Sequence, residues 1–169
     1  MKILEEFYRF KLVQTDTIVG KREYIQHPGA VSILALDDKN EILIERNLRP
    51  AINKVLIELP SGLIEDGEDP LLTAQRELLE ETGYVADKWD TLYTFYNSAG
   101  ILDEQTTIYL ARGLTFVGKK LDEEEHITQV NQEFISEDEL LELVFDSSVE
   151  MDAKIPMAAL GLSKIKGRF

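Results

Sequence analysis

The sequence predicts an α+β protein in which a mixed β-sheet lies between helices, as an α/β/α sandwich. Three observations support this fold class. Segments typical of strands fill the first part of the chain, one well-delimited helix follows, and further strands precede two final helices. A doubly wound parallel sheet would instead need helices that alternate regularly with strands. The order of elements therefore favours a mixed sheet with an added N-terminal antiparallel hairpin.

Four strands are expected before the first helix. They span residues 7–13, 19–26, 31–36 and 41–46. The polar segment 15–20 joins the first two strands as the N-terminal hairpin. Asp37-Asp38-Lys39-Asn40 joins the next two, because Asp and Asn side chains hydrogen-bond to nearby backbone groups in turns.

The helix that follows has recognisable ends. Asp69 is a suitable N-cap, Pro70 fits the first helical position, and Gly83 can close the C-terminus in a left-handed conformation. One side of this helix is apolar and is expected to be buried: Leu71, Ala74, Leu78 and Leu79.

The remaining elements complete the sandwich. Strands are expected at residues 91–96, 106–111 and 127–135, and a charged loop at 119–126. Ser136 and Glu139 form a capping box that opens a helix. A last helix is expected from residue 155 to 165, with Pro156 in its first turn.

Length and composition limit the class of protein. The 169 residues suffice for one domain, at 29–169, with a short N-terminal hairpin at 1–28. No apolar run approaches the roughly 18 residues that span a membrane, and the N-terminus is too acidic for a secretory signal. The absence of cysteine excludes disulfides and thiolate zinc sites and favours a reducing, cytoplasmic location. The net charge of −14 argues against binding a nucleic-acid polymer.

Three acidic residues on the first helix indicate the chemistry. At about 100° per residue, Glu77, Glu80 and Glu81 share one face opposite the apolar one. Like charges at this spacing repel one another, so a divalent cation beside them would be stabilising. A solvated helix face paired with Arg76 is the competing interpretation. A loop containing Gly62 leads into this helix, which favours a metal site and chemistry on phosphates.

The segment from Gly62 to Tyr84 resembles the Nudix box, G-x5-E-x7-R-E-U-x-E-E-x-G-U. Every fixed position is present, and only the final aliphatic position differs, as Tyr84. The matching residues are Gly62, Glu68, Arg76, Glu77, Leu78, Glu80, Glu81 and Gly83. The chain is thus similar to the Nudix hydrolases, a family that cleaves nucleoside diphosphates linked to another moiety.

This resemblance implies a divalent-metal site. The implied ligands of Mg2+, or alternatively Mn2+, are the carboxylates of Glu77, Glu80 and Glu81 and the carbonyl of Ser61, which suit a hard cation. Arg76 is expected to orient a motif glutamate by an ion pair. Glu68 is expected to stabilise the corner between loop and helix.

Four further segments resemble the ADP-ribose pyrophosphatase group of the family. They are residues 27–31, 45–50, 58–62 and 98–104. The resemblance implies that Arg49 contacts the diphosphate, with Arg22 a second candidate, since guanidinium groups suit phosphate oxygens. Glu104 is a further candidate for substrate binding.

The family resemblance also implies a catalytic base on the loop before the last strand. Glu125 is the first candidate and Glu123 the second, while Glu81 acts from the metal site. A base must reach the attacking water, and the sequence leaves the choice between these acids open.

The expected substrate is a nucleoside diphosphate sugar, with ADP-ribose first. The group has a proline about sixteen residues after the last motif glycine, where this chain has Ala99, so GDP-mannose or another nucleotide sugar stays open. Hydrolysis of nucleoside triphosphates or dinucleoside polyphosphates also stays open, as does a non-catalytic domain that senses nucleotide sugars. Related enzymes exchange the N-terminal hairpin between subunits, which implies a homodimer.

Overall fold

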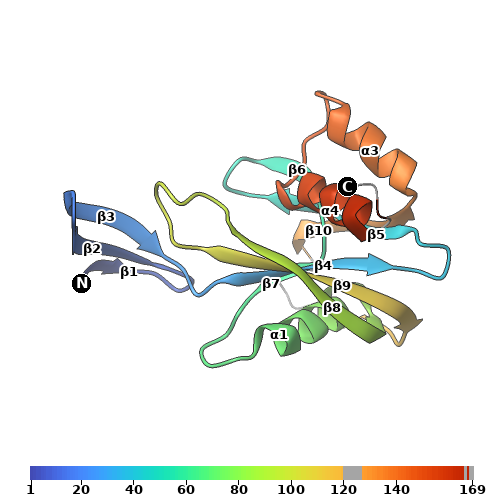
Figure 1. Cartoon of the computed structure of the whole chain (residues 1–169), viewed down its shortest axis with the longest axis horizontal. Coiled ribbons are helices and arrows are strands. Elements are labelled where there is room, and N and C mark those ends of the chain that lie inside the picture. The colour runs from blue at the N-terminus through green and yellow to red at the C-terminus, as the bar shows by residue number, and fades with distance from the viewer. Residues whose placement is uncertain (120–126, 166, 168–169) are drawn as a thin grey trace.

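A mixed β-sheet forms the centre of the molecule, with helices on both faces (Figure 1). The structure is a computed structural model that describes residues 1–119, 127–165 and 167. The strands of this sheet are β4 (Ala30–Leu36), β5 (Ile42–Arg49), β6 (Lys54–Glu58), β7 (Ser61–Leu63), β8 (Tyr84–Tyr96), β9 (Gln105–Phe116) and β10 (Gln129–Ile135). Their order is β10-β5-β4-β9-β8, with β6 paired to β5 and β7 to β4. Because β4 and β9 run parallel while the other pairs are antiparallel, the predicted mixed sheet is confirmed.

Strand β4 is buried along its whole length, because helices cover both faces of the sheet. Alternate residues, such as Val31 and Ile33, pack with Ala74 and Leu78 on the side of helix α1 (Pro70–Glu77). Those between them, such as Leu34, face helices α3 (Glu137–Phe145) and α4 (Lys154–Ile165). The predicted α/β/α sandwich is therefore confirmed.

A second, three-stranded sheet projects from one end of the molecule (Figure 1). It consists of β1 (Lys2–Glu6), β2 (Lys11–Thr17) and β3 (Gly20–Gln26), all antiparallel. The predicted hairpin is present, but its expected first strand at 7–13 is wrong. The Phe7 amide donates to the Phe10 carbonyl at 2.9 Å, and the two rings lie 4.7 Å apart. This turn reverses the chain and adds β1 to the hairpin.

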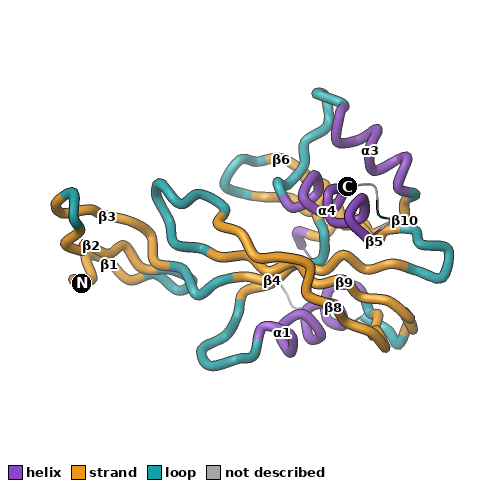
Figure 2. Tube along the Cα trace, viewed as in Figure 1, coloured by secondary structure: helices purple, strands orange, loops and turns teal. Residues whose placement is uncertain are grey.

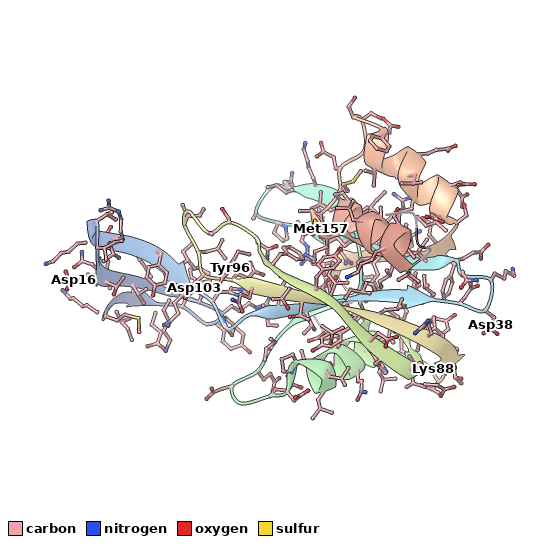
Figure 3. The ribbon with its side chains drawn as sticks, in the orientation of Figure 1. Asp16, Asp38, Lys88, Tyr96, Asp103 and Met157 are labelled. Atoms are coloured by element: carbon pink, nitrogen blue, oxygen red, sulfur yellow. The ribbon has the colours of Figure 1, made fainter. Side chains whose placement is uncertain are left out.

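The projecting sheet joins the body through the loop between β8 and β9, which reaches β3 (Figure 2). Leu102 bridges to Ile25, and the Asp103 amide donates to the Ile25 carbonyl at 3.2 Å. The carboxylate of Asp103, labelled at this junction in Figure 3, accepts from the His27 amide at 2.8 Å. These contacts fix the two sheets to each other at one end.

Three features of the main sheet depart from the sequence prediction. Strands β6 and β7 are not among the expected strands, and β8 begins at Tyr84 rather than at residue 91. The first half of β8 is largely exposed, so its sequence lacks a strand-like apolar pattern, and pairing with β9 determines its conformation. None of the described helices is long and apolar enough to cross a membrane.

Candidate active site

Helix α1 begins and ends as its sequence predicts. The Asp69 carboxylate accepts from the Leu71 amide at 2.9 Å, Pro70 follows it, and Gly83 has a φ of 78°. The expectation of one regular α-helix is corrected, however. Residues 78–82 form a wider π-helical turn, so Glu77 ends the α-helix and the next two acids lie in that turn. Turns of this kind occur frequently at functional sites.

The three acids nevertheless meet in one place. Glu77, Glu80 and Glu81 line a single cavity of about 810 Å³. The Glu77 carboxylate packs directly against the backbone of Gly62, where an added Cβ would lie 1.9 Å from its carboxyl carbon. Only glycine fits at that position, which explains why the loop before the helix needs Gly62.

Arg76 holds the acidic wall of this cavity together. Its Nη1 donates to Glu77 at 2.7 Å and to Glu80 at 3.0 Å, and its Nε donates to Glu68 at 3.2 Å. The hydrogen bond to Glu68 is the main cause of a raised pKa for Arg76, and it lowers the pKa of Glu68 to about 2. The structure therefore shows the ion pairing that is expected of Arg76 and places Glu68 at the corner between loop and helix.

The carboxylate of Glu81 points to strand β7. It accepts from the Ser61 amide at 2.8 Å, and the Ser61 hydroxyl donates to the Leu59 carbonyl at 2.8 Å. Ser61 also lines the cavity. The backbone before Gly62 and the π-helical turn therefore fix Glu81 from two sides.

Arg49 lies at the end of β5, on the same cavity, and a buried acid holds it. Its Nε donates to one Glu58 oxygen at 2.6 Å, and its Nη2 donates to the other. This hydrogen bonding raises the pKa of Arg49. The side chain of Glu58 is 1% exposed and that of Arg49 48%, so the guanidinium group is oriented from below and open above.

A second buried acid lies opposite Glu58. Glu45 pairs with Glu58 in the β5–β6 register, and Asn47 Nδ2 donates to Glu45 at 3.3 Å and to Glu58 at 3.5 Å. Gln129 Nε2, from β10, donates to Glu45 at 2.7 Å. Sequence reasoning missed this buried network. The signal was the acid Glu45 directly after the apolar run Ile42–Ile44, where a strand buried on both faces is expected to hold no unpaired charge.

The structure brings together most, but not all, of the predicted site residues. Glu104 lines the main cavity with Arg49 and the three acids. Arg22 instead lines a second hollow of about 330 Å³, together with Tyr24 and Ala99. The candidate bases Glu123 and Glu125 lie outside the described residues.

Two further basic residues line the main cavity without having been predicted. Lys154 begins α4 and pairs with Asp152 at 2.8 Å, while Arg9 comes from the turn between β1 and β2. Neither has a local sequence signal, because each reaches the cavity only through the packing of a distant element. The cavity thus has one acidic wall and several cations around it.

Comparison with known proteins agrees with this geometry. The model of the NUDIX domain matches residues 26–154. This chain belongs to the Nudix family. With the family's acids complete on one cavity wall, it is an enzyme of the Nudix hydrolase class.

The Nudix chain also resembles individual proteins over most of its length. It is 39% identical over 141 residues to the ADP-ribose pyrophosphatase of Bacillus subtilis, which is 82% of this chain and 74% of that protein. It is 38% identical over 136 residues to the methanol dehydrogenase activator of Bacillus methanolicus, 78% of this chain and 66% of that one. A crystal structure of an ADP compounds hydrolase covers 99% of this chain and 92% of its own, with a TM-score of 0.77 and 20% identity, and supports the fold.

The acidic wall suits the divalent cation that Nudix hydrolases need. Among residues 1–119, 127–165 and 167, no three acids or histidines are already grouped as a ligand set. The carboxylates instead bond to Arg76 and to the Ser61 amide. Their hard oxygen donors, gathered on one wall of an open cavity, fit a hard cation in chemistry.

Proposed function

We propose that this Nudix hydrolase cleaves the diphosphate of a nucleoside diphosphate sugar, with ADP-ribose giving AMP and ribose 5-phosphate. The observation that supports this most is the single cavity in which the acidic wall of Glu77, Glu80 and Glu81 faces the oriented fork of Arg49. A cation on the wall and a guanidinium group beside it together match a diphosphate. The Bacillus subtilis relative, named ADP-ribose pyrophosphatase, supports ADP-ribose as the first substrate.

We further propose Mg2+ as the cation, with Mn2+ as the alternative. The residues that would hold it are the carboxylates of Glu77, Glu80 and Glu81 and the Ser61 carbonyl. When bound, such a cation neutralises phosphate oxygens and lowers the pKa of a water molecule.

The protein's own residues would divide the remaining work. Arg49 binds the diphosphate, Glu104 contacts the substrate, and Arg76 positions the motif glutamates. A water oxygen bonds to one phosphorus while that phosphorus loses its bond to the bridging oxygen. The proton of the water passes to a base, for which Glu125 and then Glu123 are proposed. Arg22 is proposed as a second phosphate contact only if a partner subunit brings it to the cavity.

The test of the substrate class is a panel of nucleotide sugars. ADP-ribose, GDP-mannose and other nucleotide sugars, a nucleoside triphosphate and a dinucleoside polyphosphate are each incubated with Mg2+, and phosphate is measured after phosphatase coupling. We expect ADP-ribose to be cleaved fastest. Cleavage of the dinucleoside polyphosphate with every nucleotide sugar intact would refute the proposed class. Faster cleavage of GDP-mannose would correct only the sugar, as Ala99 in the second hollow allows.

The competing function is a non-catalytic domain that senses nucleotide sugars or regulates a partner, as the name of the Bacillus methanolicus relative suggests for that protein. The complete acidic wall favours hydrolysis. Glu81→Gln removes one negative ligand and should lower kcat by about 100-fold or more at saturating Mg2+. Turnover close to wild type in this variant would contradict the proposed role of the acidic wall. Binding of ADP-ribose by the wild-type protein without turnover would support the sensing function.

We also propose a homodimer built through the projecting N-terminal sheet. This sheet exposes several apolar side chains, namely Ile3, Phe7, Tyr8, Phe10, Ile18 and Val19. Exposed apolar groups gathered on a projection are typical of a surface that another chain covers. The division into a dimerising segment 1–28 and a hydrolase domain 29–169 stays a prediction, as does the cytoplasmic location, which rests on the absence of cysteine.

A further inference from the structure

Strand β10 presents two glutamines to the end of the catalytic helix. Gln129 Nε2 donates to the Glu81 carbonyl at 3.2 Å, and Gln132 Nε2 donates to the Thr82 carbonyl at 3.1 Å. The last carbonyls of a helix lack donors within the helix and need partners from elsewhere. These two side chains therefore cap the π-helical turn from the edge of the sheet.

A β-bulge makes this double contact possible. On a regular strand, residues three apart point to opposite faces of the sheet. Here Gln129 pairs with Asn47 and Asn131 pairs with Arg46, so β10 has one extra residue between its pairs. The extra residue restores a common direction to Gln129 and Gln132. The bulge is thus the local feature that aims both glutamines at the helix.

Gln129 makes two contacts that Gln132 lacks. Its Nε2 also donates to Glu45 at 2.7 Å, and its Oε1 accepts from Lys119 Nζ at 2.7 Å. Glu45 is 1% exposed, so this bond ties Gln129 to a fixed point inside the sheet. The donors and acceptors of the Gln129 amide all match their partners, whereas Gln132 Oε1 is buried without a partner among the described residues.

We propose that Gln129 is a positioning residue that acts through Glu81. Glu81 is held at its carbonyl by Gln129 and at its carboxylate by the Ser61 amide. Because the buried Glu45 anchors Gln129, the position of the Glu81 carboxylate is referred to the rigid strand β5. Its effect on turnover rests on the proposed hydrolysis, whereas its effect on cation binding does not.

A charge-preserving exchange isolates the contact to Glu81. In Glu45→Gln/Gln129→Glu, the amide introduced at position 45 can donate to the carboxylate introduced at position 129. The oxygen of that amide can accept from Asn47, which donates to Glu45 in the wild-type protein. The carboxylate at position 129 can still accept from Lys119. Net charge is unchanged, and the contact to the Glu81 carbonyl is the one that loses its donor.

The exchange variant is compared with wild type and with Gln129→Glu alone. Gln129→Glu puts two carboxylates together and should lower the melting temperature in EDTA. The exchange should bring that temperature back to within about 3 °C of wild type. Its kcat on ADP-ribose should still be about 10–100-fold low with little change in KM, and its Mn2+ affinity about tenfold or more below wild type. A role in stability alone would restore all of these quantities together, and that result would overturn the proposal.

Gln132→Ala is the matched control, because it removes the neighbouring cap without touching Glu45 or Lys119. We expect its kcat and Mn2+ affinity to stay within about threefold of wild type. Losses as large as those of the exchange variant would mean that any cap suffices, and the proposal would be wrong. If wild type cleaves no nucleotide sugar, the proposed function fails, while Mn2+ titration of the same variants still tests Gln129.

Discussion

At the scale of single residues, Arg76 balances the charge of the acidic wall. It contacts Glu77, Glu80 and Glu68 at once, and its planar fork can serve several carboxylates, which a lysine could not do with the same geometry. The motif thus has its own internal cation. The carboxylates that are proposed to bind a metal are held close together without one, which keeps the wall in place before the cation binds.

The hydrogen bond from Arg76 should make stability depend on pH through Glu68. The pKa of Glu68 lies at about 2 in the folded protein, below its ordinary value of 4.5. A lowered folded pKa adds stability that is complete above pH 4.5 and disappears as the pH falls through about 2. Glu68→Gln should therefore be less stable than wild type by a constant amount above pH 4.5, and this difference should shrink towards pH 2.

Urea unfolding in EDTA at several pH values measures this difference. Glu142→Gln, on the exposed surface of α3, controls for the loss of one negative charge. A gap between wild type and Glu68→Gln that stays the same from pH 5 to about 2 would show that the Arg76 bond does not lower the pKa of Glu68.

At the scale of elements, local signals predicted what lies within one segment. Asp69, Pro70 and Gly83 marked the ends of the catalytic helix, and the motif spacing brought its acids together. The π-helical turn was not predictable, because the different helix types share the same residue preferences. Nor were the contacts of Gln129 with Glu45 and Glu81, since they join strands and a helix far apart in sequence and depend on a bulge.

The approach of β7 to helix α1 leads to a prediction about Gly62. A methyl group there would lie 1.9 Å from the Glu77 carboxyl carbon, so Gly62→Ala must displace that carboxylate. We expect kcat to fall by about 100-fold, because a ligand moved by an ångström costs that much. Steady-state kinetics with Mg2+ and melting in EDTA are the measurements.

Gly100→Ala is the matched control for Gly62→Ala, because nothing lies within 4 Å of an added methyl group at Gly100. We expect its kcat to stay within about twofold of wild type. If Gly62→Ala kept its kcat and its melting temperature, Glu77 would have room to move without consequence. The close packing of β7 on the helix would then be irrelevant to the site.

At the scale of the whole molecule, the charge and the shape place different demands on partners. The net charge of −14 repels polyanions, yet the cavity gathers Arg9, Arg49 and Lys154 beside the acidic wall. A small phosphorylated ligand can therefore enter where a nucleic-acid polymer is disfavoured. The projecting sheet poses a separate question, because its contacts with the body are limited to one end while its apolar side chains lie exposed.

The tip of the projecting sheet tests the proposed homodimer. Ile18 and Val19 lie at the turn between β2 and β3, near Asp16 in Figure 3, and are 105% and 63% exposed in the single chain. Burying them against a second chain would remove apolar surface from water. Light scattering should give about twice the 19.3 kDa chain mass for wild type and a lower mass for Ile18→Ser/Val19→Ser. Phe145→Ser, equally apolar and 82% exposed on α3, should leave the mass unchanged. A wild-type mass of 19.3 kDa at every concentration would refute the dimer, and an unchanged dimer in the tip variant would place the interface elsewhere.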